Sequence, residues 1–121
     1  MATLVAKGEQ MSLYTYRAIV DRWVDGDTVD MVVDLGFRIS THQRFRLLGD
    51  ALAPIIDTPE RGEPGYVEAR KVSESIHPPG SSVIISTEKP LSGDKYGRYL
   101  VLLPEVNAAL RASGLLKDGS K

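Results

Sequence analysis

Short apolar and β-branched runs alternate with turn-forming residues along most of this chain. Runs of this length, bounded by glycine, proline and aspartate, are typical of β-strands. The pattern predicts five strands, at residues 14–24, 28–35, 37–48, 82–87 and 99–103. An Asp-Gly pair at 25–26 is a strong hairpin signal between the first two runs, and Gly36 marks the next turn.

Two further segments are predicted to be helices. Residues 66–76 (YVEARKVSESI) stop before an HPPG sequence at 77–80, and residues 105–113 (EVNAALRAS) stop at Gly114. Proline and glycine end helices at such positions. The stretch 49–65 is rich in proline and glycine and is predicted to be one long loop. Loops of that length in small domains are often functional.

The order of these elements is three strands, a helix, two strands and a helix. Five strands with a helix between the third and fourth predict a mainly β, α+β fold, a closed OB-type Greek-key barrel that ends in a short helix. An open α+β sheet is the alternative, and the pattern alone does not decide between them. We expect residues 13–117 to form this single domain, after a polar, flexible leader at 1–12 and before a tail at 118–121.

Length and composition fit one domain of 121 residues, with 42% apolar residues to fill one core. No window approaches the ~20 apolar residues of a membrane span. The first ten residues show no secretory signal. We therefore expect a monomer with no membrane partner and a cytoplasmic location, unless a signal has been removed upstream.

The residue types present restrict the chemistry. The chain has no cysteine, which excludes disulfides and thiolate metal sites, and two histidines cannot build a zinc site alone. Any metal would be a hard cation held by oxygen ligands. The formal net charge of −1 argues against tight, extended binding of nucleic acid, but not against local phosphate chemistry.

Two acidic motifs carry candidate chemistry. The DGDT sequence at 25–28 is either a hairpin turn in which glycine supplies a positive φ, or a turn that directs Asp27 inward as a metal ligand. The DTPE sequence at 57–60 is either a polar turn or helix cap, or the source of two functional carboxylates, Asp57 and Glu60. One of these would bind a cation, and the other would take a proton from water.

A third motif places an arginine in an apolar strand. Arg46 lies within the FRLL sequence at 45–48, where a charge is costly unless it is paired. In a regular strand it would share one face with Arg38, His42 and Arg44. That face is either solvated, or it presents Arg46 as a bidentate phosphate ligand.

The fourth motif is the DKYGR sequence at 94–98. It is either an ordinary charged turn, or a turn that gives Arg98 to a phosphate with Lys95 and Tyr96 beside it. Each of the four motifs is weak when taken singly.

Jointly and in this order, the motifs resemble the staphylococcal (micrococcal) nuclease, or thermonuclease, family of SNase-like domains. The resemblance runs from about Tyr14 to Lys117 and includes a V-N-A-A-L…G-L helix at Val106–Leu115. It implies an OB-fold barrel that hydrolyses phosphodiester bonds of DNA and RNA with Ca²⁺.

Carried over by motif, the resemblance implies that Asp27, Asp57 and the backbone carbonyl of Thr58 bind calcium. It gives Glu60 the role of general base on the attacking water. A hard, flexible calcium site suits carboxylate and carbonyl oxygens together with water.

The same resemblance implies that Arg46 and Arg98 hold the phosphate and stabilise charge in the transition state. Lys95 and Tyr96 would line the nucleotide site. The implied partner is therefore a DNA or RNA substrate.

One departure from the family lies between the phosphate and metal motifs. Ten residues separate Arg46 from Asp57, where family members have about four, so residues 50–55 (DALAPI) are extra. They either loop out, leaving Asp57 in place, or extend the third strand, which would put Leu52 and Ile55 at the ligand positions. The second register favours a catalytically impaired OB module that binds nucleic acid or protein. A third hypothesis is that the six residues were inserted into a shorter active chain, whose activity their removal would restore.

Overall fold

The structure is a computed structural model that describes residues 14–49, 55–89 and 97–116. Within these residues the chain forms five strands and two helices in the predicted order. The elements are β1 (Thr15–Asp25), β2 (Thr28–Gly36), β3 (Ile39–Leu47), α2 (Tyr66–Ile76), β4 (Ser82–Glu88), β5 (Tyr99–Leu102) and α3 (Pro104–Ser113). No bound differs from the predicted one by more than two residues, and those of α2 coincide with the prediction.

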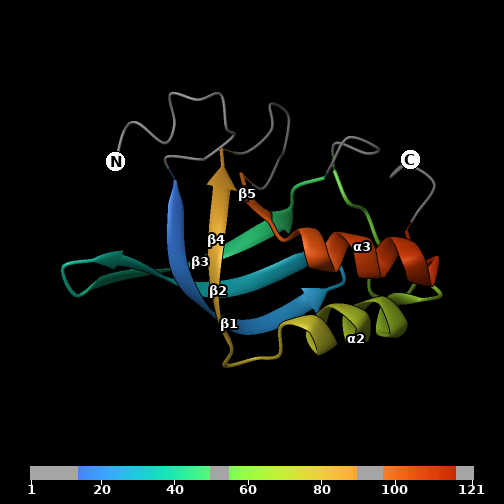
Figure 1. The fold of residues 1–121 in the computed structure, drawn as a ribbon. Helices are drawn as coiled ribbons and strands as arrows, with labels where there is room; N and C mark the ends of the chain where they lie inside the picture. Colours follow the sequence, from blue (N-terminus) through green and yellow to red (C-terminus); the bar gives the residue numbers. More distant parts are fainter. Residues whose placement is uncertain (1–13, 50–54, 90–96, 117–121) are drawn as a thin grey trace.

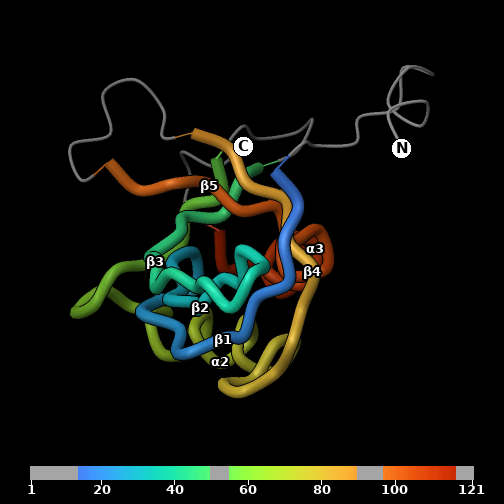
Figure 2. Tube along the Cα trace, turned by 90° about the vertical axis from the view of Figure 1, so that its left-hand side faces the viewer, coloured from blue at the N-terminus to red at the C-terminus, as the bar shows by residue number. Residues whose placement is uncertain are grey.

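The strands close into a barrel in the order β1-β2-β3-β5-β4 (Figures 1 and 2). β1 pairs antiparallel with both β2 and β4, and β5 pairs antiparallel with β4. β3 pairs antiparallel with β2 over its length, but parallel with β5 only from Phe45 to Leu47. This closed ring confirms the predicted OB-like barrel and excludes the open sheet, because every strand has a neighbour on both sides.

The two helices pack against each other and lie away from the projecting β2–β3 hairpin (Figure 1). α2 connects β3 to β4 and ends at Ile76, just before Pro78, which has no N–H to continue a helix. α3 begins with Pro104 in its first turn and is capped by Gly114. The φ of 74° at Gly114 is the left-handed conformation that glycine adopts without strain. Local sequence signals therefore set where both helices end.

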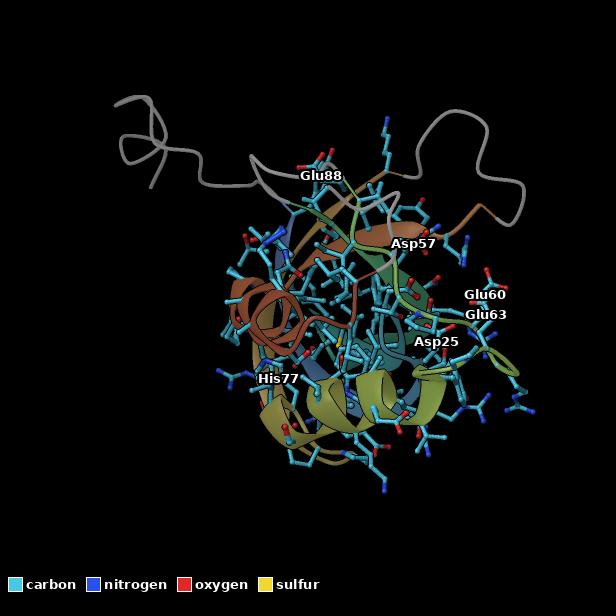
Figure 3. The ribbon with its side chains drawn as sticks, turned by 90° about the vertical axis from the view of Figure 1, so that its right-hand side faces the viewer. Asp25, Asp57, Glu60, Glu63, His77 and Glu88 are labelled. Carbon is cyan, nitrogen blue, oxygen red and sulfur yellow. The ribbon has the colours of Figure 1, made fainter. Side chains whose placement is uncertain are left out.

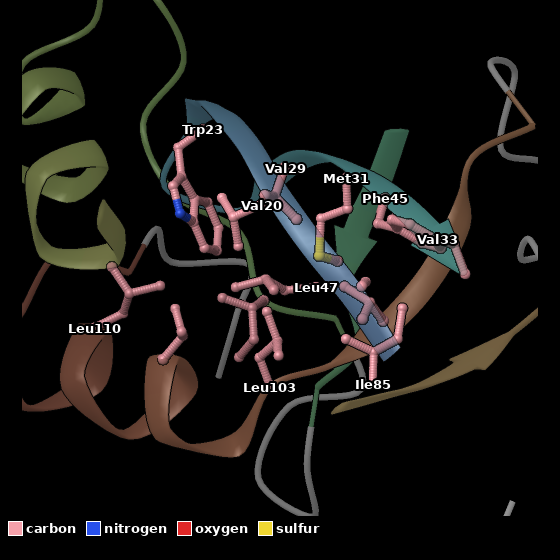
Figure 4. Close-up of a cluster of buried hydrophobic side chains, with 14 of the residues drawn as sticks. Val20, Trp23, Val29, Met31, Val33, Phe45, Leu47, Ile85, Leu103 and Leu110 are labelled. Atoms are coloured by element: carbon pink, nitrogen blue, oxygen red, sulfur yellow. The ribbon is translucent and has the colours of Figure 1, made fainter. Parts of the chain in front are cut away.

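Apolar side chains from the strands and both helices fill the interior. Met31, Leu47 and Ile85, from three different strands, are fully buried and meet in the core (Figure 4). The one tryptophan of the chain, Trp23, is 2% exposed, and its Nε1 donates a hydrogen bond to the carbonyl of His77 at 2.9 Å. This buried indole connects β1 to the segment after α2 and can serve as a fluorescent reporter of folding.

The turn between β2 and β3 differs from the prediction. The third strand was predicted to begin at Phe37, but Phe37 and Arg38 form the turn and β3 begins at Ile39. Their φ values are 57° and 64°, and a two-residue hairpin of this kind needs positive φ at both central positions. Asn-Gly is the usual pair there, so Phe-Arg carried no turn signal. The prediction that Arg38 shares a strand face with His42 and Arg44 is therefore wrong.

The predicted leader at 1–12 and the tail at 118–121 lie outside the described residues. Within the part of the chain that the structure describes, no helix is long and apolar enough to cross a membrane.

Candidate functional site

Close packing fixes the turn between β1 and β2 that carries Asp27. A Cβ on Gly26 would lie 2.9 Å from the Cβ of Ala69 in α2 and 2.9 Å from Oγ1 of Thr58. Only glycine therefore lets the turn, the helix and the 57–60 loop approach this closely. The interpretation that Gly26 supplies a positive φ is wrong, since it is not among the glycines with positive φ. The turn needs glycine for space.

Asp27 is buried, with 5% of its surface exposed, and its carboxylate accepts two hydrogen bonds. Oδ1 accepts from the hydroxyl of Thr28 at 2.9 Å, and Oδ2 accepts from the amide of Thr58 at 2.9 Å. The amide of Asp27 itself donates to Oδ1 of Asp25 at 3.2 Å. The structure thus brings the two acidic motifs, 31 residues apart in sequence, into direct contact.

Burial and the neighbouring Asp25 raise the pKa of Asp27 to about 7. Loss of hydration is the largest cause, and the hydrogen bond and negative charge of Asp25 add to it. The Thr58 amide and the Arg46 guanidinium lower the same pKa, but do not outweigh the other effects. A carboxyl group in these surroundings is stabilised in its ionised form by any added positive charge. Groups with such perturbed pKa values often mark functional sites.

Arg46 lies between two carboxylates. Its Nη2 is 3.0 Å from Oδ1 of Asp57 and 3.7 Å from Oδ2 of Asp27. Its Nε is buried and has no hydrogen-bond partner among the described residues. A buried N–H without a partner is costly, so a hydrogen bond from this Nε to an anion that enters the site would be favourable.

The extra residues do not move the acidic loop away from the barrel. β3 ends at Leu47, and Leu48 forms an isolated antiparallel bridge with Ile55. The chain therefore leaves β3 and returns beside it before Asp57 meets Arg46. The register in which the third strand runs on through residues 51–55 is wrong. Asp57 lies beside Arg46, as the first register predicts, and residues 50–54 lie outside the described part of the chain.

Two polar side chains of the helices hold the backbone from which the site projects. In α2, Ser73 is fully buried and its hydroxyl donates to the carbonyl of Gly26 at 2.7 Å. In α3, Asn107 donates from Nδ2 to the carbonyl of Leu48 at 2.9 Å. Sequence reasoning missed both residues. For Ser73 the available signal was a small polar residue on the apolar face of a helix.

Arg98 lines a cleft of about 520 Å³ beside the β1–β2 turn. Its walls are the end of β1 and the start of β2, Gln43 and Arg44 of β3, and Gly97 and Arg98 before β5. Thr28, which lines the cleft, pairs with Arg46 across β2 and β3. The cleft therefore borders the group formed by Arg46, Asp27 and Asp57. We refer to this space below as the cleft.

Of the remaining predicted site residues, Glu60 belongs to the described part of the chain. Glu60 is exposed, and its carboxylate makes no hydrogen bond or ion pair with the described residues; its amide donates to Oε1 of Glu63 at 2.7 Å. Figure 3 shows Asp57, Glu60 and Glu63 on the same side of the molecule. Lys95 and Tyr96 fall outside the described residues.

Oxygen atoms suited to a hard cation meet at the contact between the two acidic motifs. Among the described residues, no group of three or more Asp, Glu or His side chains is arranged to hold a metal ion. An ion here would depend on Asp27 and Asp57, a backbone oxygen and water, which is within the range of calcium sites. Oγ1 of Thr58 is buried without a hydrogen-bond partner in the described chain. The carboxylates of Asp27 and Asp57 share the single guanidinium of Arg46, and the hydroxyl of Thr58 has no hydrogen-bond partner in the described chain. These oxygen atoms fit the binding of an added cation.

No protein-family model matches this chain, and a search of curated proteins found no significant match. The fold, a closed five-stranded barrel of the OB-like class with two short helices, is shown by the structure itself.

Proposed function

We propose that this protein is a calcium-dependent nuclease of the staphylococcal nuclease type that hydrolyses phosphodiester bonds of DNA or RNA. The observation that supports the proposal most is the setting of Arg46. Its guanidinium lies between Asp27 and Asp57, and its buried Nε has no hydrogen-bond partner among the described residues. Arginine binds phosphate oxygens through pairs of N–H groups, and the unsatisfied Nε is one such donor.

In this proposal Arg46 and Arg98 bind the scissile phosphate and stabilise the negative charge that grows on it during the reaction. Asp27, Asp57 and the carbonyl of Thr58 hold calcium, which when bound supplies Lewis-acid stabilisation of that charge. The ion pairs of both carboxylates with Arg46, and the hydrogen bond from the Thr58 amide to Asp27, support this assignment. Arg46 would thus contact the phosphate from the side of Asp27 and Asp57, and Arg98 would contact it from the side of the cleft.

Glu60 is the proposed general base, because it lies in the same loop as Asp57 and its carboxylate is not engaged by described residues. It would accept a proton from the attacking water. Lys95 and Tyr96 are proposed to bind the nucleotide. An exposed or single-stranded nucleic acid is the expected substrate.

The test is cleavage of single-stranded DNA and RNA with Ca²⁺ and with a chelator. We expect cleavage only with Ca²⁺, and a loss of about 100-fold or more in kcat/KM for Arg46→Ala and for Glu60→Ala. Arg70→Ala is the matched control, because it removes an arginine paired with Glu74 at 3.1 Å on α2 and should leave the rate unchanged. Full cleavage in chelator, or by Arg46→Ala, would refute the proposal.

A second candidate function is an OB-like module that binds nucleic acid without cutting it. The observation that favours it is that Arg44 and Arg98 line the cleft, where they can bind phosphate groups without a metal ion. It predicts that the protein binds single strands yet releases no product with any divalent ion. Cleavage that depends on Glu60 would exclude this candidate.

A further inference from the structure

Three charged side chains form a row across β1, β2 and β3. Asp30 of β2 pairs in register with Arg22 of β1 and with Arg44 of β3. Oδ1 and Oδ2 of Asp30 accept from Nε and Nη2 of Arg44 at 2.7 and 3.1 Å. Oδ2 also accepts from Nε of Arg22 at 3.2 Å. The carboxylate is almost covered, because only 6% of the Asp30 side chain is exposed.

This row carries one more positive than negative charge, although the whole chain has a formal net charge of −1. Hydrogen bonding from Arg44 is the largest cause that lowers the pKa of Asp30, so the carboxylate stays ionised at neutral pH. The two-point contact holds the Arg44 guanidinium in one orientation. It uses two of the five N–H groups of that guanidinium, which leaves three for another acceptor.

Only one of the two arginines faces the cleft. Arg44 lines the cleft together with Arg98, whereas Arg22 does not. Arg44 and Arg46 are two residues apart on the outer face of β3, which corresponds to about 7 Å along a strand. That separation is comparable with the distance between neighbouring phosphates of an extended single strand. The cleft therefore presents a second fixed cation next to the proposed phosphate site.

We propose that Arg44, held in place by Asp30, binds a second phosphate of the nucleic-acid strand, next to the phosphate bound by Arg46 and Arg98. This inference rests on the proposed function for the identity of the ligand. Arg44 is the residue that contacts the flanking phosphate, and Asp30 is a positioning residue. The site makes the protein prefer a strand with several phosphates over a single phosphodiester.

A purely structural role for the row is the competing explanation, in which the arginines only neutralise a buried carboxylate. Arg22→Gln provides the matched control, because it also removes one ion pair to Asp30 but lies outside the lining of the cleft. A structural role predicts similar effects for Arg22→Gln and Arg44→Gln. A phosphate-binding role predicts that only Arg44→Gln weakens the binding of a strand.

The experiment measures binding of a single-stranded oligonucleotide of about eight nucleotides by fluorescence anisotropy, with calcium and a non-cleavable backbone. We expect Arg44→Gln to raise Kd by about tenfold, as for the loss of one charge-assisted contact, and Arg22→Gln to change it by less than about twofold. The slope of log K against log salt should become less negative by about 0.7 for Arg44→Gln only. Equal effects of the two substitutions would overturn the proposal.

A second arm uses a dinucleoside monophosphate, which has one phosphodiester and no flanking phosphate. Here the two variants should differ from each other by less than about twofold in Kd, because the flanking site is empty. A tenfold selective loss by Arg44→Gln on this short ligand would overturn the proposal by placing Arg44 at the first phosphate. Binding is measured apart from cleavage, so a protein that binds strands through Arg44 but never cuts them would refute the nuclease proposal alone.

Discussion

At the scale of single residues, Asp27 and Asp30 lie close together in the chain, and the structure shifts their pKa values in opposite directions. Both are nearly covered, with 5% and 4% of their surfaces exposed. For Asp27, loss of hydration on burial is the largest cause and Asp25 adds to it, so its pKa rises to about 7. Asp30 lies between Arg22 and Arg44, and its pKa falls. The partners of a buried carboxyl group therefore decide the sign of the shift, and burial alone does not.

The raised pKa of Asp27 predicts a stability that depends on pH. Between about pH 4 and 7 the Asp27 carboxyl group is protonated in the folded protein but ionised in the unfolded chain. The preferential protonation of the folded state stabilises it fully below the unfolded pKa, and this stabilisation is lost as pH rises through 7. We expect Asp27→Asn, measured in chelator, to be more stable than the unsubstituted protein at pH 8 by a few kcal/mol. The advantage should disappear near pH 4. Urea unfolding followed by Trp23 fluorescence measures both values.

For Asp30, the predicted change of stability with pH has the opposite sign. Its lowered pKa means that the ionised form stabilises the fold above the unfolded pKa, and that this is lost as pH falls through the folded pKa. Asp30→Asn should therefore destabilise the protein at pH 7 by about 1–3 kcal/mol, with a smaller loss in strong acid. Equal pH profiles for the Asp27 and Asp30 variants in the same unfolding experiment would contradict both assignments.

At the scale of elements, the β2–β3 hairpin holds two ordinary residues in the left-handed region. Phe37 is 95% exposed and contributes no packing to offset its positive φ. Replacing the pair by Phe37→Asn and Arg38→Gly should stabilise the protein by about 1–2 kcal/mol, because Asn and Gly adopt these angles readily. Denaturant titration of the double variant tests this. Phe37→Ala alone removes the aromatic ring but keeps the strain, so it should change stability by less than about 0.5 kcal/mol.

Helix α2 supports the site through one buried hydrogen bond. Ser73→Ala would leave the carbonyl of Gly26 without its partner, at a cost of about 1–3 kcal/mol, and should lower cleavage because Asp27 follows directly in the turn. Ser75 is the control on the same helix, since it is exposed and bonds only the carbonyl of Val72 in its own helix. Ser75→Ala should cost less than about 0.5 kcal/mol. Thermal melts and the cleavage assay together separate the two serines.

At the scale of the whole molecule, the nearly neutral charge limits how a nucleic acid can be held. The chain has a net charge of −1, and among the described residues the cations proposed to bind phosphate are Arg44, Arg46 and Arg98. Two or three phosphate contacts predict a slope of log K against log salt of about −1.4 to −2 for a single strand. Titrating a labelled oligonucleotide at several salt concentrations measures it. A slope steeper than about −5 would mean that many more cations than these three contact the strand, and would contradict this prediction.

Much of the architecture followed from local signals that act over a few residues. Apolar runs set the strands, and proline and glycine set the ends of α2 and α3, because proline lacks an N–H and glycine adopts a left-handed φ without strain. The turn at Phe37 and Arg38 could not be predicted, since its φ values are imposed by the pairing of β2 with β3. The role of Gly26 was also misjudged, because its close neighbours come from distant segments.

The sequence by itself determined the order of elements, the mainly β, α+β class and the identity of the charged residues, whereas the closure of the barrel came from the structure. Only the tertiary structure decided which of those residues meet. It brought Asp57 to Arg46 despite the six extra residues, because the Leu48–Ile55 bridge returns the chain to β3. It also set Asp30 between two arginines and Asp27 beside Asp25. Contacts of this kind depend on chain closure and register across strands, which no local pattern encodes.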